Sequence, residues 1–324
     1  MDSAYATNSG PHPQDARGAQ KAAALRLRRK RWKMNVPLLI LFTPIVVFFM
    51  VFKYAPMAGL VIAFKQYTFM EGIWGSAWVG LKNFKLLFSN SLTLSIIRNT
   101  VVLSGLSIFV GFPFPIALAI MLNEARKKWF KRLVQTMVFL PHFLSWAVIG
   151  GIVVTIFSQE TGIVNYILKA VNGATFPFLY QDRSWIAIFV GSGIWKGVGW
   201  GSIIYLAALT TIDSHLYEAA SMDGAGKWRQ IWHITLPGIS PTIILVFILT
   251  MGNVMEVGFD QVYILQNASV SGVAEVISTY IYRVGLQRAQ FSLTAAMGLF
   301  ESLIGLVFVL TANRIARRFG QGLW

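Results

Sequence analysis

The sequence predicts an all-α membrane protein with six transmembrane helices. Of its 324 residues, 55% are hydrophobic and only 13% are charged, and the apolar residues come in long blocks. Soluble domains carry about 25% charged residues. A block of about 20 apolar residues is long enough to cross the hydrocarbon core of a bilayer as a helix. Basic residues flank several blocks, so membrane orientation explains the net charge of +15 better than nucleic-acid binding does.

The composition divides the chain into a tail and one transmembrane domain. Residues 1–35 form a polar, basic tail that we expect on the cytoplasmic side. The apolar block that follows is too long for the core of a signal peptide, so we expect a retained first span. Residues 36–324 are predicted to form the transmembrane domain, with spans at about 36–57, 99–122, 133–157, 185–209, 241–262 and 291–312.

Proline and glycine give individual spans features of their own. Pro113 and Pro115 are predicted to kink the second span, because proline interrupts helical hydrogen bonding. In the fourth span Gly193, Gly197 and Gly201 recur at four-residue spacing. Small residues on one helical stripe let two helix backbones approach closely, so this stripe predicts tight packing.

Lys and Arg are distributed unequally between the two sides of the predicted membrane domain. Eight precede the first span, five lie in 123–132, two in 213–238 and three after 312, out of 28 in the chain. Cytoplasmic segments carry an excess of such residues. We therefore expect both termini and the 213–238 segment in the cytoplasm, which agrees with an even number of spans.

Residues 213–238 form a polar interruption between the fourth and fifth spans and predict two short helices. Asp213 or Ser214 can cap the first helix, because a short side-chain oxygen accepts a hydrogen bond from the opening turn. The first helix should end at Asp223-Gly224, where glycine tolerates a sharp turn. The second should run from about Lys227 to Ile234 and be stopped by Pro237.

The same segment resembles the EAA loop of bacterial ABC importer permeases of type I, the MetI-like, binding-protein-dependent family. Glu218-Ala219-Ala220 is followed by three residues, Gly224, nine residues and Ile234-Thr235-Leu236-Pro237, and every fixed position of the family pattern is met. The resemblance implies a coupling helix that receives motion from an ATPase. The implied coupling residues are Glu218, Ala219, Ala220, Gly224, Ile234, Leu236 and Pro237.

The resemblance also implies partners and a location. Such permeases work in pairs in the bacterial cytoplasmic (inner) membrane, here expected as a heterodimer with a second homologous permease, in contact with membrane lipid. Two ABC ATPase subunits carry ATP and Mg, and a solute-binding protein delivers the cargo. No cofactor is expected on this chain itself. Gly226-Lys227 is followed by Trp228, and Ser221 stands where a phosphate-binding loop needs glycine.

Two further stretches resemble the polysaccharide-importer branch of the family. One is the Y-A-P-M-x-G-x-x-I-A-F-K pattern at Tyr54–Lys65, and the other is G-x-x-N-F at Gly80–Phe84. They imply an oligosaccharide substrate, with an acidic, alginate-type chain as the first hypothesis. Permeation of another solute, such as glycerol phosphate or a peptide, is the alternative.

Four polar residues within the predicted spans are candidates for the substrate path: Lys196, Asn253, Glu256 and Asp260. Ionisable residues in a bilayer most often mark a polar pathway or an interhelical contact. Glu256 and Asp260 stand four apart, so on a helix they would share a face, and a membrane-embedded transferase using them is a less favoured hypothesis. The four histidines have no metal-ligand spacing and cysteine is absent, so neither a metal site nor catalytic residues are expected.

Overall fold

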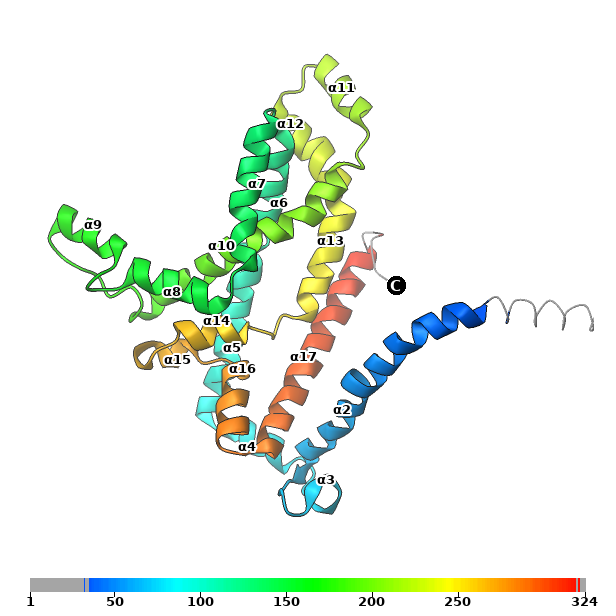
Figure 1. Ribbon diagram of the computed structural model, residues 1–324, viewed down its shortest axis with the longest axis vertical. Helices are drawn as coiled ribbons and strands as arrows, with labels where there is room; N and C mark the ends of the chain where they lie inside the picture. Colours follow the sequence, from blue (N-terminus) through cyan, green and yellow to red (C-terminus); the bar gives the residue numbers. More distant parts are fainter. Residues whose placement is uncertain (1–31, 33–34, 319, 321–324) are drawn as a thin grey trace, which may run out of the picture. The chain divides into compact units, whose positions relative to one another are not determined.

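The computed structural model describes residues 32, 35–318 and 320, and it is built from helices (Figure 1). Most of the predicted basic tail lies outside the described residues. The described residues fall into two units, one that ends at Val61 and one that begins at Ile62. Five described helices are long and apolar enough to cross a membrane, and a bent pair makes a sixth span if it is counted as one. The predicted class, an all-α membrane protein, is confirmed.

The first span is longer than predicted, because the helix runs from Asn35 to Phe64. Pro56 falls in its interior, where it lacks the N–H that the helix would use. The backbone around it adjusts through a π turn, η1 (Met50–Tyr54), followed by α2 (Ala55–Met57) and the 3₁₀ turn η2 (Ala58–Phe64). None of the residues in the most apolar window of this helix is buried.

A small folded segment precedes the second span. Strands β1 (Lys65–Gln66) and β2 (Ala77–Trp78) pair antiparallel around α3 (Gly72–Gly75), and α4 (Lys82–Ser89) follows. The side chain of Asn83 is buried and donates hydrogen bonds to the Ala63 carbonyl at 2.8 Å and the Lys65 carbonyl at 3.1 Å. Gly80 has φ of +59°, which favours glycine. The glycine and asparagine of the G-x-x-N-F pattern therefore stabilise the local fold of this segment.

The second and third spans each contain a break. Helix α5 (Ser91–Gly111) continues into α6 (Pro113–Glu124) at the predicted proline position. The third span, predicted as one helix over 133–157, is instead α7 (Lys128–Phe143) and α8 (Trp146–Phe157), bent by 106°. The single-helix prediction was wrong because Ser145 starts a new helix: its side chain accepts a hydrogen bond from the Val148 N–H.

Helix α10 (Asp182–Leu209) is the central helix of the larger unit and packs against α5, α6, α7, α8 and α13. The predicted glycine stripe is only partly used for close packing. A Cβ on Gly201 would lie 3.1 Å from Pro115, whereas one on Gly197 would have no neighbour within 4 Å. The closest approach is at Gly199, outside the stripe, where a Cβ would overlap the Val138 carbonyl of α7. Helix α9 (Ile163–Asn172) lies in the preceding connection.

The hairpin between the fourth and fifth spans consists of α11 (Ser214–Met222) and α12 (Lys227–Gln230). Pro237 does not stop the second helix, contrary to prediction. The chain stays helical from Lys227 to Gly252 through a π turn, η3 (Ile231–Thr235), into α13 (Leu236–Gly252). The wider π turn that directly precedes α13 accommodates Pro237, whose missing N–H would otherwise interrupt the helical hydrogen bonds.

The fifth span ends earlier than predicted, at Gly252, and residues 253–258 are not helical. A series of short elements then leads to the sixth span. They are α14 (Phe259–Leu265), η4 (Ala268–Val270), α15 (Ser271–Ala274), α16 (Ile277–Tyr280) and the π turn η5 (Ile281–Gln287), followed by α17 (Phe291–Arg318). Buried side chains of α14, η4 and α15 pack on α5, α8 and α10, and those of α16 and η5 pack in a second cluster with α5, α13 and α17.

Candidate functional site

Helix α11 is fixed at both ends by the signals that the sequence contains. The Asp213 carboxylate accepts a hydrogen bond from the His215 N–H at 2.9 Å and caps the helix. At the other end Gly224 adopts φ of +74°, and the Ala225 N–H donates to the Ala220 carbonyl at 2.8 Å. Such a glycine-based end satisfies helix carbonyls that otherwise lack a donor. The geometry of the turn is therefore fixed by the Gly224 backbone conformation and by this hydrogen bond.

Two polar contacts hold α11 against the second arm of the hairpin. The Tyr217 hydroxyl lies 3.0 Å from the Thr235 hydroxyl, in the π turn η3. The buried Gln230 side chain donates to the Ser221 hydroxyl at 2.9 Å and to the Ala225 carbonyl at 3.1 Å. These groups were not singled out from the sequence. They make the hairpin a small folded piece whose orientation is set by its own side chains.

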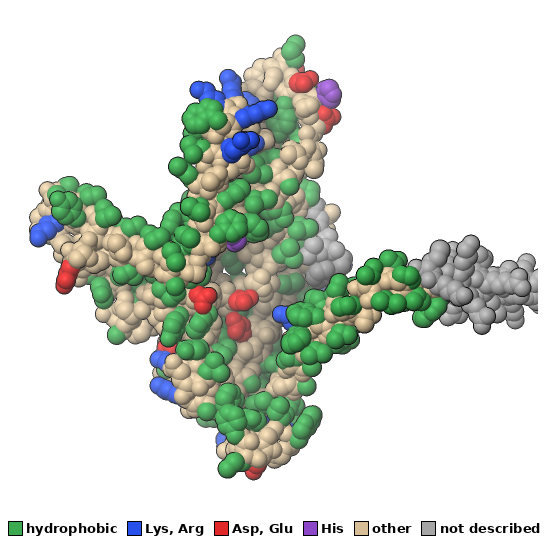
Figure 2. Space-filling model, in the orientation of Figure 1, with side chains coloured by type: hydrophobic (Ala, Val, Ile, Leu, Met, Phe, Trp, Pro, Cys, Tyr) green, Lys and Arg blue, Asp and Glu red, His purple; other side chains and the backbone are tan. Residues whose placement is uncertain are grey.

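The predicted coupling residues divide between the exposed surface and the base of the hairpin. Glu218, Ala219 and Gly224 are exposed, as are the apolar neighbours Leu216 (53%) and Met222 (88%). Ala220, Ile234 and Leu236 are half-buried, and Pro237 is exposed. The Glu218 carboxylate lies 3.4 Å from the exposed His215 ring. Figure 2 shows acidic and His side chains over α11 at the end of the molecule.

An ion pair connects the hairpin to the end of the second span. The Lys227 ammonium lies 2.7 Å from the carboxylate of Glu124, the last residue of α6. The side chains are 64% and 32% exposed, so water screens the pair and its contribution to stability is small. The pair connects the first residue of α12 to the end of α6, 103 positions earlier in the sequence, and so helps to position the hairpin.

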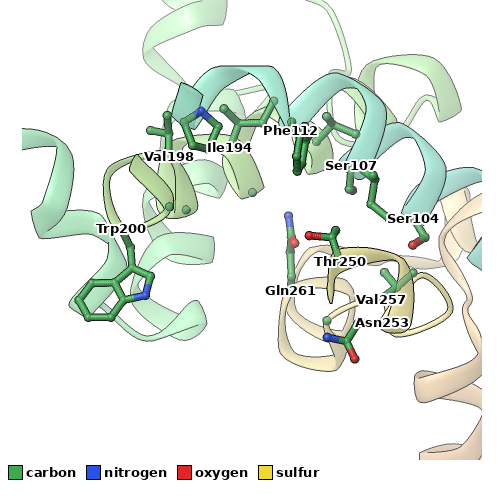
Figure 3. A pocket seen from close by; sticks show the side chains of 18 of the residues that line it. Ser104, Ser107, Phe112, Ile194, Val198, Trp200, Thr250, Asn253, Val257 and Gln261 are labelled. Atoms are coloured by element: carbon green, nitrogen blue, oxygen red, sulfur yellow. The ribbon is translucent and has the colours of Figure 1, made fainter. Parts of the chain in front are cut away.

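A cavity of about 800 Å³ lies between α5, α6, α8, α10, α13 and the segment that leads into α14 (Figure 3). Apolar residues and glycines form most of its wall, among them the aromatic Phe112, Trp146 and Trp200 and the glycines Gly193, Gly197 and Gly201. Its polar groups are the side chains of Ser104, Ser107, Tyr205, Thr250, Asn253, Glu256 and Gln261. Ser107 of α5, Thr250 of α13 and Gln261 of α14 line the same space from three different elements (Figure 3). The wall therefore combines ring faces with a few hydrogen-bonding groups.

Of the four predicted path residues, Asn253 and Glu256 line this cavity. They also line a second, adjacent cavity of about 500 Å³, together with Ser278, Ser302 and Glu301. Asp260 lies in the first turn of α14 and lines neither cavity. The prediction that Glu256 and Asp260 share a helix face was wrong, because the helix ends at Gly252 and restarts only at Phe259.

Lys196 is not among the lining residues of either cavity. Its ammonium donates to the carbonyls of Pro141 at 3.4 Å, His142 at 3.0 Å and Leu144, and lies 5.6 Å from the centre of the Trp146 ring. These carbonyls belong to the end of α7, where a helix has no internal donors and carries partial negative charge. Lys196 thus stabilises the break in the third span, and its predicted role in the substrate path stays a prediction.

Sequence reasoning missed Glu301 and Gln261 among the lining residues. Glu301 is the single acidic residue of the sixth span, so its charge within an apolar block could have indicated it. Gln261 is buried and donates to the Phe189 carbonyl at 2.6 Å and the Ser192 hydroxyl at 3.2 Å. No local signal distinguishes this amide, because its partners stand about 70 residues earlier in α10.

Comparison with known proteins identifies the family. Residues 111–323 match the family described as "binding-protein-dependent transport system inner membrane component". The chain belongs to this family. The permease is 41% identical over 305 residues to the polygalacturonan/rhamnogalacturonan transport system permease protein YteP of Bacillus subtilis. The alignment covers 92% of this chain and 95% of that protein.

Two solved structures resemble the permease along nearly its whole length. One is a bacterial ABC transporter involved in the import of the acidic polysaccharide alginate, with a TM-score of 0.83, 42% identity, and coverage of 90% of this chain and 99% of that chain. The other is a bacterial alginate ABC transporter in complex with alginate pentasaccharide-bound periplasmic protein, with a TM-score of 0.83, 41% identity, and coverage of 90% and 98%. The predicted resemblance to ABC importer permeases is confirmed. The family is one of transport components and not of enzymes.

The matched region contains the whole hairpin and most of the cavity wall, including α10, α13 and α14. Ser104 and Ser107 of α5 lie before it. The hairpin and the cavity residues Asn253 and Glu256, which were both predicted from the sequence, therefore lie in the segment that matches the family. The hairpin lies at the exposed end of the helices that enclose the cavity (Figure 1).

Proposed function

We propose that this permease is one of two transmembrane subunits of an ATP-driven importer and that it forms part of the path for an oligosaccharide. The observation that carries the proposal is the exposed hairpin. Its apolar Leu216 and Met222 and its acidic Glu218 are presented to solvent on a helix whose orientation is fixed from behind by Tyr217 and Gln230. Exposed apolar residues on a rigid, projecting element are typical of a docking site for another protein.

The partner we propose for the hairpin is an ABC ATPase subunit, which holds the ATP and Mg that this chain is not expected to bind. Two such subunits, a second homologous permease and a solute-binding protein would complete the assembly. One of the similar solved structures contains a periplasmic protein with bound substrate, which supports the last of these partners. Movement of the ATPases would displace α11, and the continuous helix from Lys227 to Gly252 would carry that displacement to the cavity.

The proposed orientation places both termini and the hairpin on the cytoplasmic side of the bacterial inner membrane. The chain contains no cysteine, so an Asp223→Cys variant has a single thiol at the exposed hairpin turn. A maleimide that cannot cross membranes should label it in inverted vesicles and not in intact cells. Labelling from the outside would place the hairpin away from any ATPase and overturn the proposal.

Coupling itself is tested by reversing the charge of the exposed carboxylate. Glu218→Lys should reduce ATPase co-purification, or the stimulation of ATP hydrolysis by loaded binding protein, by at least about tenfold, because a charge that must pair at a protein interface typically costs 2–5 kcal/mol when its partner is left unpaired. Gly224→Val should have a similar effect through strain at φ of +74°. Glu71→Lys is the matched control, since Glu71 is also exposed but lies outside the hairpin. Equal loss in the control would contradict the coupling role.

The proposed substrate is an oligosaccharide, with an acidic, alginate-type chain as the first candidate. Aromatic and hydrogen-bonding groups share the cavity wall, which suits sugars because rings stack on their C–H faces while hydroxyls need polar partners. YteP is described as a permease for polygalacturonan and rhamnogalacturonan, and one of the similar structures is of an importer of the acidic polysaccharide alginate. ATP hydrolysis by the reconstituted importer should rise with binding protein loaded with uronate oligosaccharides. A rise only with glycerol phosphate or a peptide would favour the alternative substrates.

The transferase hypothesis has lost its basis, because Glu256 and Asp260 share no helix face.

A further inference from the structure

Five cations surround the start of α7: Arg126, Lys127, Lys128, Lys131 and Arg132. We name this group the basic collar. All but the half-buried Lys131 are exposed. Figure 2 shows Lys and Arg side chains gathered over the end of the molecule where α6, α7 and α12 lie, apart from the acidic groups over α11. The two charge types therefore occupy separate surfaces of the same end.

Within the described part of the chain, no carboxylate neutralises the basic collar. None of its five residues takes part in an ion pair, and the nearest acidic residue in the sequence, Glu124, is paired with Lys227. No acidic residue occurs between Glu124 and Glu160. The collar also sits at the N-terminal end of a 16-residue helix, whose dipole adds positive potential there. An anion from outside the chain is the natural counter-charge.

The exposed apolar surface of α7 continues directly from the basic collar. Trp129, Leu133, Met137 and Leu140 are 64%, 45%, 63% and 59% exposed and follow at spacings of four, four and three, so they form one stripe along the helix. An α-helix rises about 1.5 Å per residue, so the cations lie within about one to two turns of this apolar surface. Trp129, the first residue of the stripe, lies at the level of the collar, and tryptophan is enriched at the membrane–water interface.

We propose that the basic collar and Trp129 form a binding surface for the headgroups of anionic phospholipids in the leaflet at the hairpin side of the membrane. The stripe lies in hydrocarbon, Trp129 sits at the boundary, and the collar reaches the phosphate groups beside it. A lipid fits better than a soluble anion because the cations and the exposed apolar stripe share one helix. The proposal does not depend on the substrate or on the ATPase partner.

The test uses the complete importer in nanodiscs of phosphatidylcholine with increasing phosphatidylglycerol. The variant Arg126→Gln/Lys127→Gln/Arg132→Gln removes three collar charges, and Lys82→Gln/Lys85→Gln/Lys169→Gln removes three exposed cations elsewhere. Each basic residue near a charged surface contributes about fivefold to the affinity for anionic lipid, so three removals should weaken phosphatidylglycerol retention by about 100-fold. The readouts are lipid bound per complex by native mass spectrometry and the thermal midpoint as a function of phosphatidylglycerol content. The control variant should behave as the wild type.

Several outcomes would overturn the proposal. Equal phosphatidylglycerol retention in the collar variant and the wild type would do so, and so would an equal loss in the control variant. Loss of an ATPase subunit from the collar variant, with lipid retention unchanged, would assign the surface to a protein partner instead. Trp129→Ala provides a second variant that keeps every charge. It should lower retention of phosphatidylglycerol and phosphatidylcholine alike, because it removes interfacial anchoring and not charge.

Discussion

The hairpin of α11 and α12 and the wall of the cavity differ in how far apart their contacting residues stand in the sequence. In the hairpin, Gln230 reaches Ser221 over 9 positions and Tyr217 reaches Thr235 over 18. Around the cavity, Gln261 reaches Phe189 over 72 positions and Ser104 reaches Val254 over 150. The hairpin is a local structure, whereas the cavity exists only once the spans have assembled.

This difference has a mechanistic consequence. A locally stabilised hairpin can move as a unit and keep its shape, which suits an element that transmits a displacement. A wall assembled from distant segments changes when those segments shift, which suits a cavity that must open and close. We therefore expect substitutions in the assembled bundle to affect folding strongly, and substitutions at the connection to the hairpin to affect coupling with little change in stability.

The largest effect is expected at the closest contact in the bundle. Gly199→Ala would place a methyl group against the Val138 carbonyl, and overpacking of this kind costs about 1–3 kcal/mol or more where backbone must move. Gly197→Ala is the matched control two residues away, because a Cβ there meets nothing within 4 Å. Thermal unfolding in detergent should show a lower midpoint for Gly199→Ala only. Equal midpoints would show that α7 and α10 are not closely packed.

A somewhat smaller effect is expected where the third span breaks. Lys196→Met keeps much of the side-chain volume but removes a charged donor from the carbonyls of Pro141, His142 and Leu144. Hydrogen bonds of charged groups contribute about 1.5–3 kcal/mol, so the thermal midpoint should fall clearly. Lys196→Arg should retain part of the stability, because it keeps the charge and several donors. If Lys196→Met instead left stability unchanged and altered only transport, the path role predicted from the sequence would be favoured.

The smallest effect on stability is expected at the ion pair between Glu124 and Lys227. Exposed pairs contribute about 0.2–1 kcal/mol, so Glu124→Lys or Lys227→Glu should barely change the thermal midpoint. If the pair holds the hairpin in register with α6, each single variant should lower the substrate-stimulated ATPase rate, and the double charge exchange should restore it. A double variant no better than the singles would show that the pair has no part in coupling. The basal ATPase rate is the internal control.

The sequence determined those features that depend on neighbouring residues. The number and order of apolar blocks predicted the membrane class, because a span needs only enough consecutive apolar residues. The cap at Asp213 and the turn at Gly224 were also predicted, since both depend on the conformational preferences of single residues. The spacing of Glu218, Gly224 and Pro237 was by itself enough to indicate the family.

Only the tertiary structure decided where the spans break and what meets inside them. The same apolar composition fits one straight helix over 133–157 or the two helices of the bent span, and the ammonium of Lys196, which stabilises the bend, comes from α10. Pro237 by itself predicts a stop, but a π turn carries the helix past it. Likewise, the end of α13 at Gly252 separates Glu256 from Asp260 and brings Glu256 beside Glu301 at a shared cavity. These outcomes depend on contacts between segments that are distant in the chain, and local propensity carries no information about such contacts.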